Sequence, residues 1–149
     1  MIIKEISAIS TQLHSKIVSL LSELTDKKIS FSMDDFLSIV QSKNSILYGA
    51  FNRGELIGIL TLVIIDIPTG RQLRIEDVVV DKIQRGKGIG ELLTREAIKR
   101  AEKMEVSKIS LTSNPSRISA NKLYQKIGFK LRNTNSYVLT LEKNGDDNE

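Results

Sequence analysis

The chain has 149 residues, a hydrophobic fraction of 40% and a formal net charge of +4 at pH 7, which fits one globular domain with one core. It has no cysteine and one histidine, His14, so disulfides, thiol nucleophiles and thiolate metal sites are excluded and no metal centre is expected. The most apolar run, 56–67, is too short for a membrane helix and no signal peptide is recognisable, so we expect a soluble cytoplasmic protein with no membrane partner. No basic run is interleaved with aromatics, so the composition does not favour nucleic acid.

The first half of the chain predicts a strand, two helices and an antiparallel meander. After a strand at residues 1–6, one helical face is marked by Ile9, Leu13, Ile17, Leu20, Leu21 and Leu24. A second helix is predicted to begin at Ser32, where the hydroxyl and the Asp35 carboxylate form a capping-box pattern. Strands are then expected at 46–51, 56–65 and 72–80, separated by short turn sequences.

The second half predicts two helices and three further strands. The helices carry their apolar positions at Leu93, Ala97, Ala101 and Met104, and at Ala120, Leu123 and Ile127. Strands are expected at 106–112, from Phe129 onward, and around Tyr137, Leu139 and Leu141. The order β-α-α-β-β-β-α-β-α-β-β indicates an α/β (α+β) domain over residues 1–142, with a mixed, mostly antiparallel sheet and helices on both faces. The acidic tail, 143–149, is expected to be disordered.

A glycine-rich turn follows the strand that ends at Val80. It reads Arg85-Gly86-Lys87-Gly88-Ile89-Gly90 and leads directly into a helix. Glycines at a strand-to-helix turn leave several backbone N–H groups free, and the helix dipole adds positive potential. The turn is therefore expected to bind an anion such as a phosphate.

Two common phosphate loops do not match this turn. A P-loop requires G-x-x-x-x-G-K-[ST], but no Lys-Ser or Lys-Thr pair follows the glycines. A dinucleotide fingerprint requires G-x-G-x-x-G, whose third glycine would fall on Glu91 or Leu93. The remaining pattern is R-x-x-G-x-G after an apolar strand.

That pattern resembles the coenzyme A pyrophosphate loop of the GNAT superfamily of acetyl-CoA-dependent N-acetyltransferases. A second segment, Ala120 to Phe129, resembles the A-x-x-L-Y-x-x-x-G-F segment of the same superfamily, and the element order also agrees. The resemblance covers residues 1 to about 141. One departure is Arg117, which stands where many members have an asparagine; Asn114 and Asn121 flank it.

The resemblance implies a set of cofactor contacts. The pyrophosphate of acetyl-CoA would lie on the backbone of Arg85, Gly86, Lys87, Gly88, Ile89 and Gly90, with Arg85 and Lys87 either adding charge or remaining solvated. The pantetheine arm would pair with the backbone of Val78, Val79 and Val80 like an additional strand. Asn114 or Asn121 would contact the same arm.

The resemblance also implies the reaction, attack of a primary amine on the acetyl thioester. Tyr124 is expected to protonate the leaving thiolate and to contact the cofactor; the alternative is a packing residue on an amphipathic helix. Because an alkyl ammonium must lose a proton first, a base or a water chain is needed. Glu76 is the candidate base, since strand parity predicts that it faces the same side as Val78 and Val80. A merely structural pair with Arg74 or a nearby lysine is the alternative, and Asp77, on the opposite face, is the weaker candidate.

The acceptor is not defined by the sequence. A small-molecule amine and a peptide are both compatible with the resemblance. A protein N-terminal acetyltransferase of the ribosomal-protein type and a non-catalytic acyl-CoA-binding module are the alternatives. The chain could act as a monomer or a homodimer.

Overall fold

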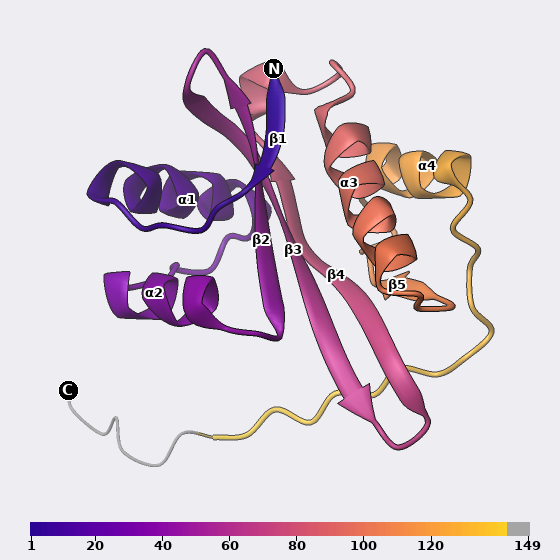
Figure 1. Cartoon of the computed structure of the whole chain (residues 1–149). Coiled ribbons are helices and arrows are strands. Elements are labelled where there is room, and N and C mark those ends of the chain that lie inside the picture. The colour runs from indigo at the N-terminus through magenta and orange to yellow at the C-terminus, as the bar shows by residue number, and fades with distance from the viewer. Residues whose placement is uncertain (143–149) are drawn as a thin grey trace.

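The computed structural model describes residues 1–142 and shows one sheet with helices on both faces (Figure 1). The predicted acidic tail, 143–149, lies outside the described residues. The elements in chain order are β1 (Ile2–Glu5), α1 (Thr11–Leu24), α2 (Met33–Gln41), β2 (Ser45–Asn52), β3 (Glu55–Ile67), β4 (Gly70–Val80), the 3-10 turn η1 (Lys82–Gln84), α3 (Ile89–Lys103), β5 (Ile109–Leu111) and α4 (Ile118–Ile127).

The sheet has the strand order β1-β2-β3-β4-β5. The predicted three-stranded meander is confirmed, since β2, β3 and β4 are antiparallel neighbours, and β1 adds a fourth antiparallel strand beside β2. Strand β5 is parallel to β4 because α3 carries the chain back across the sheet. The mixed sheet with helices on both faces confirms the predicted fold class. The β5 strand is short and pairs only with Leu73 to Ile75, so among the described residues no strand adjoins β4 on that side from Glu76 to Val80.

A β-bulge interrupts β4 at Asp77. Val79 pairs with Ile59 and Glu76 pairs with Thr61, so two β4 residues lie opposite one residue of β3. Asp77 accommodates the extra residue with a φ of +50°, a conformation that costs energy for a residue with a side chain.

The bulge reverses the alternation of side chains along β4. Val78 and Val80 pack on the same core cluster as Ile75, on the α3 side of the sheet. The prediction that Glu76 shares a face with Val78 and Val80 is therefore wrong, because strict alternation does not hold across a bulge.

Two hydrophobic layers enclose the sheet. On one face α1 and α2 cover a cluster that includes Ile17, Leu20 and Phe36, and on the other face α3 contributes Leu93 and Ala97. The capping box of α2 is present: the Asp35 amide donates to the Ser32 hydroxyl at 3.0 Å, and the Ser32 amide donates to the Asp35 carboxylate at 2.9 Å. The capping box is therefore confirmed, and the two clusters confirm the predicted apolar faces of α1 and α3.

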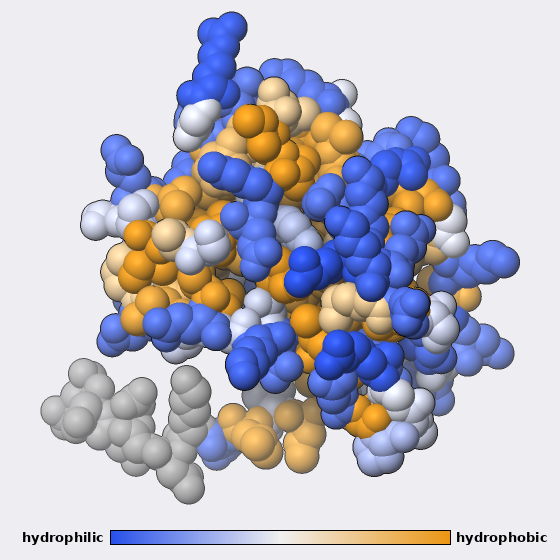
Figure 2. All heavy atoms as spheres, viewed as in Figure 1, coloured by the Kyte–Doolittle hydropathy of each residue, from blue (hydrophilic) through white to orange (hydrophobic). Residues whose placement is uncertain are grey.

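The last two predicted strands are absent from the structure. After α4 the described chain, through residue 142, has no helix or strand; in the view of Figure 1 it crosses the lower part of the β3–β4 hairpin. Leu131 and Tyr137 are 95% and 88% exposed, and apolar atoms stand out beside the grey residues at the lower edge of Figure 2. The prediction was wrong because alternating apolar residues form a strand only where a neighbouring strand pairs with them.

Candidate active site

The turn that follows β4 consists of Asp81, η1 and the glycine-rich residues 85–90. Asp81 caps η1 by accepting the Ile83 amide at 3.2 Å. Gly86 and Gly88 both have a φ of +78°, and Gly88 is the N-cap of α3. Only glycine adopts this conformation at little cost, so the backbone conformation explains why Gly86 and Gly88 are glycines.

The backbone of the turn leaves donors free. Within residues 1–142, the N–H groups from Gly86 to Glu91 have no backbone or side-chain acceptor. The last three belong to the first turn of α3, where the helix dipole is positive. At Gly90 an added Cβ would make an ordinary contact with Leu123 at 3.5 Å, so packing alone does not require this third glycine.

The two basic side chains of the turn behave differently. Arg85 folds back: its Nε donates to the Val80 carbonyl at 3.1 Å, and its Nη2 donates to Glu23 at 3.2 Å. Lys87 donates to the neutral side-chain amide of Gln84 at 2.8 Å. In this structure Arg85 is thus partly neutralised, whereas Lys87 contributes its full charge to the turn.

Helix α1 is tied to the turn at two points. Lys16 Nζ lies 3.0 Å from the Asp81 carboxylate, and Glu23 accepts the Lys82 amide at 3.0 Å as well as Arg85. The hydrogen bond from Lys16 lowers the pKa of Asp81, and the same bond raises the pKa of Lys16. Both ties join α1, on one face of the sheet, to the turn that begins α3 on the other.

Glu91 joins α3 to α4 beside the turn. Its carboxylate lies 2.9 Å from Lys126 and 2.8 Å from Arg95. The hydrogen bond from Lys126, followed by that from Arg95, holds the pKa of Glu91 below its usual range. Because both neighbours are cations, the negative charge of Glu91 does little to weaken the positive potential at the start of α3.

A cavity of about 140 Å³ opens where β4 and β5 separate. It lies between the bulge of β4, the end of β5, α4 and the last residue of α1. Its lining residues are Leu24, Ile75, Glu76, Asp77, Val78, Leu111, Thr112, Arg117 and Tyr124. The cavity therefore brings Glu76 and Val78 of β4 together with Tyr124 of α4, residues that were predicted as site residues from two separate segments.

Tyr124 is 6% exposed and meets the Phe129 ring edge-on at 5.9 Å between ring centroids. Burial raises the pKa of Tyr124, while the positive charge of Arg117 lowers it and partly opposes this effect. The phenol therefore holds its proton at neutral pH. A protonated phenol that lines a cavity can donate a proton or a hydrogen bond to a bound molecule.

The three charged side chains of the cavity differ in their partners. Glu76 forms an ion pair with Arg74 at 2.7 Å, as the alternative interpretation expected, while still lining the cavity. Asp77 has no ion pair with any described residue. Arg117 Nη2 donates to the Val78 carbonyl at 3.3 Å.

The two asparagines near α4 shape the backbone. Asn121 donates through Nδ2 to the carbonyl of Asn114 at 3.0 Å, and the Asn114 side chain accepts the Ser116 amide at 2.9 Å. Neither residue lines the cavity, whereas Arg117 does. Their contact with a cofactor stays a prediction, and Arg117 enters the site from a position that the sequence marked only as a departure from the motif.

The strand segment Val78 to Val80 combines packing with free backbone. Val79 is buried beneath α1 and α2, and Val78 and Val80 pack on the α3 side. On the open edge, the carbonyls of Val78 and Val80 accept hydrogen bonds from Arg117 and Arg85 in place of a strand. Two arginines therefore occupy the edge that an extended ligand would need.

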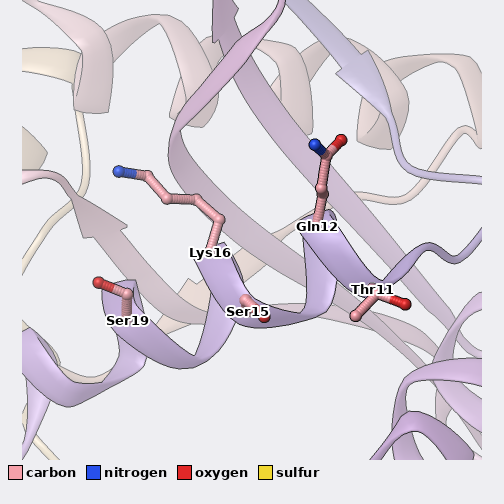
Figure 3. A pocket seen from close by; sticks show the side chains of 5 residues that line it. All are labelled: Thr11, Gln12, Ser15, Lys16 and Ser19. Carbon is pink, nitrogen blue, oxygen red and sulfur yellow. The ribbon is translucent and has the colours of Figure 1, made fainter.

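A second, more open cavity of about 400 Å³ lies along α1. Figure 3 shows the side chains that line it: Thr11, Gln12, Ser15, Lys16 and Ser19. It shares no lining residue with the Tyr124 cavity and holds no acid or phenol that could transfer a proton. Although it is larger, it is the weaker candidate for a site of chemistry.

His14, Tyr48 and Tyr137 lie away from the cavity lining. His14 Nε2 is 2.6 Å from the Phe31 carbonyl and its ring stacks on Phe31, so the side chain has a packing role. Tyr48 is buried in the core beneath α3. No group of three or more acidic or histidine side chains within residues 1–142 could hold a metal ion, and no helix in that range has the length and apolar character needed to cross a membrane.

Comparison with known proteins identifies the family. Residues 16–129 match the model of the acetyltransferase (GNAT) family. The chain is 33% identical to streptothricin acetyltransferase of Escherichia coli over 110 residues, and 28% identical to N-acetyltransferase 8 of Homo sapiens over 112 residues. Each alignment covers 73% of this chain, but 62% and 49%, respectively, of those proteins.

A solved structure agrees with this assignment at the level of the fold. A putative acetyltransferase from Agrobacterium tumefaciens superposes with a TM-score of 0.81 at 18% identity, covering 94% of this chain and all of that one (100%). The chain belongs to the GNAT acetyltransferase family, a family that uses acetyl-CoA. It spans about half to three-fifths of the length of its curated relatives.

The Lys16–Asp81 tie leads to a pH-dependent stability prediction. Replacing Asp81 with Asn keeps an oxygen for the Ile83 amide but removes the charge that faces Lys16. Because the folded pKa is lowered, the ionised carboxylate stabilises the fold above the unfolded pKa of about 3.9, and this contribution is lost as the pH falls through the folded value. We expect D81N to lower the free energy of unfolding by about 1 kcal/mol at pH 7 and by much less near pH 3.

Urea unfolding at both pH values measures this difference. Glu55→Gln is the matched control, since Glu55 lies 3.6 Å from the same Lys16 but is 70% exposed, and E55Q should have little effect. An equal loss of stability for D81N at both pH values would show that the ion pair is not its source.

Proposed function

We propose that this protein transfers the acetyl group of acetyl-CoA directly to a primary amine of a small molecule or peptide. The main support is one arrangement: the turn with free amides ends the same strand whose bulge lines the Tyr124 cavity. A ligand with an anion on the turn and a reactive group in the cavity would lie along the open edge of β4. Acetyl-CoA has its pyrophosphate and its thioester at the two ends of such an extended arm.

The turn would hold the pyrophosphate mainly through backbone N–H groups between Gly86 and Gly90, with Lys87 adding charge. The pantetheine arm would take the place of a strand beside Val78, Val79 and Val80. For this, the side chains of Arg85 and Arg117 must leave the carbonyls that they occupy in the free protein. A displaced Arg85 is then free to approach the phosphates.

In the reaction, the nitrogen of the neutral amine attacks the thioester carbonyl carbon. The new C–N bond forms, the C–S bond breaks, and coenzyme A leaves as a thiolate. Tyr124 donates its phenolic proton to that sulfur, and the proton lost by the amine passes to solvent or to a base. Glu76 is the candidate base, because its carboxylate lines the cavity in which the amine must react.

The role of Tyr124 predicts a separation of turnover from binding. Tyr124→Phe keeps the ring that packs on Phe129 but removes the proton donor. We expect Y124F to lower kcat about 10²- to 10⁴-fold while the Kd for acetyl-CoA stays nearly unchanged. Release of free coenzyme A thiol in the presence of amines measures kcat, and calorimetry measures Kd.

Tyr48→Phe is the matched control, since it removes the hydroxyl of a buried tyrosine outside the cavity. Its turnover should equal that of the unchanged protein. Equal turnover of Y124F and Y48F would remove Tyr124 as the proton donor.

The role of the turn predicts a specific loss of cofactor binding. Gly88→Ala and Gly54→Ala both place a Cβ at a positive φ, +78° and +82°, with no atom within 4 Å, so their backbone strain is matched. Each should reduce stability by about 1 kcal/mol. We expect only G88A to weaken acetyl-CoA binding, by about tenfold or more, because it distorts the amides that face the pyrophosphate.

Calorimetric titration of both variants with acetyl-CoA tests this point. If G54A weakens binding as much as G88A does, the loss reflects general destabilisation. The turn would then not be the pyrophosphate site.

The role of Glu76 predicts a changed pH profile. In Glu76→Gln the rise of kcat/KM with pH near neutrality should become flatter, because the carboxylate no longer accepts the proton. Arg74→Gln removes the same ion pair but keeps the carboxylate, so R74Q should retain a rising profile. Identical profiles for E76Q and the unchanged protein would assign proton removal to solvent.

A further inference from the structure

The charged residues of the Tyr124 cavity suggest what kind of acceptor it takes, and this inference rests on the proposed function. Glu76 is neutralised by Arg74, but Asp77 and Arg117 line the same cavity without forming an ion pair with each other or with any other described residue. One carboxylate and one guanidinium thus remain available for a ligand. Opposite charges that share a cavity without pairing fit a molecule that carries both signs.

Arg117 has donors to spare. A guanidinium carries five N–H donors, and within residues 1–142 the Arg117 side chain makes one hydrogen bond, through Nη2 to the Val78 carbonyl at 3.3 Å. That carbonyl is where the pantetheine arm is proposed to pair, so cofactor binding would release this last contact. The planar donor fork of arginine matches a carboxylate, which can accept two parallel hydrogen bonds.

The charge of Arg117 also acts near the reacting atoms. It lowers the pKa of Tyr124 against the stronger effect of burial. The guanidinium therefore lies close enough to the phenol to influence it, and the phenol is the proposed donor to the thiolate. An anionic group bound to Arg117 would be near the point at which the acceptor amine must attack.

Asp77 is held at the bulge in an unfavourable conformation. Its φ of +50° is strained for a residue with a side chain, and glycine would adopt it more easily. Strained residues often lie at sites where the strain supports binding or catalysis. A carboxylate at this position can accept hydrogen bonds from an incoming ammonium group.

The size of the cavity and the net charge of the chain also favour a small zwitterionic acceptor. At about 140 Å³ the cavity is small compared with the roughly 300–1,000 Å³ of sites that take drug-sized ligands. The chain carries a net charge of +4, which does not attract polycations. A compact zwitterion fits these features better than a large polyamine.

We propose that the acceptor is a small amine that carries a carboxylate close to the reacting nitrogen, as an amino acid does, with Arg117 binding the carboxylate and Asp77 receiving the ammonium group. Arg117 thereby acts as a specificity-determining residue. The bound ammonium then gives up a proton to solvent or to Glu76, and the resulting neutral amine attacks the thioester carbonyl carbon.

The test uses pairs of amines that differ only in the carboxylate. Phenylalanine is compared with phenethylamine, and alanine with ethylamine; spermidine and a C-terminally amidated peptide complete the panel. Release of coenzyme A thiol gives kcat/KM for each amine. We expect the carboxylate-bearing member of a pair to be preferred about ten- to a hundred-fold, which is the size of a charge-assisted hydrogen bond.

Two variants of Arg117 then test whether this side chain causes the preference for carboxylate-bearing amines. In R117Q the ratio of kcat/KM within each pair should fall about tenfold or more, and in R117K it should fall less, because the charge remains without the donor fork. The pKa of each amine is the same whichever enzyme variant is assayed. A change in the kcat/KM ratio between variants therefore measures the contribution of the Arg117 side chain. Lys99→Gln removes one positive charge from the exposed side of α3, outside the cavity, and should leave the ratio unchanged.

Binding of acetyl-CoA and circular dichroism establish that each variant is folded. Equal or better turnover of the carboxylate-free amines, of spermidine or of the peptide would overturn the inference and leave the proposed function intact. An unchanged ratio in R117Q would also overturn it. Absence of transfer to every amine in the panel would instead overturn the proposed function, and the inference with it.

Discussion

The site depends on a missing strand partner beside β4. Pairing with β5 ends at Ile75, and the rest of β4 has no strand on that side within the described residues. Backbone groups on an open edge need partners, and here the carbonyls of Val78 and Val80 take hydrogen bonds from two arginines. The separation of β4 from β5 also opens the Tyr124 cavity. Because of the bulge at Asp77, both acidic residues of β4, Glu76 and Asp77, line that cavity.

Helix α1 makes the turn and the cavity parts of one unit. Lys16 and Glu23 bind the turn, and Leu24, at the end of the same helix, lines the cavity. A displacement of α1 would therefore move both ends of the proposed cofactor site. Since α1 belongs to one face of the sheet and α3 to the other, these ties hold the two layers together at the edge where the sheet is least paired.

The sequence predicted those features that local patterns encode. The glycines of the turn, the capping box of α2, the apolar faces of α1 and α3 and the position of Tyr124 follow from spacing and residue type, and the structure has them. The bulge at Asp77 had no such signal, because a bulge depends on the register between two strands. The bond from Arg117 to Val78 joins residues far apart in sequence, which spacing cannot reveal. The prediction of the final strands was wrong for a related reason. The alternating apolar residues at Tyr137 and Leu139 do not by themselves provide a neighbouring strand to pair with.

The two arginines on the open edge also affect how tightly a cofactor could be held. An arm that pairs with Val78 and Val80 would replace existing hydrogen bonds with new ones, so the exchange would contribute little net free energy. The affinity for the cofactor would then come chiefly from the glycine-rich turn, and the open edge of β4 would align the pantetheine arm with the cavity. If the turn determines how tightly the cofactor binds and the edge of β4 determines where its arm lies, a substitution could change one of these properties with little effect on the other.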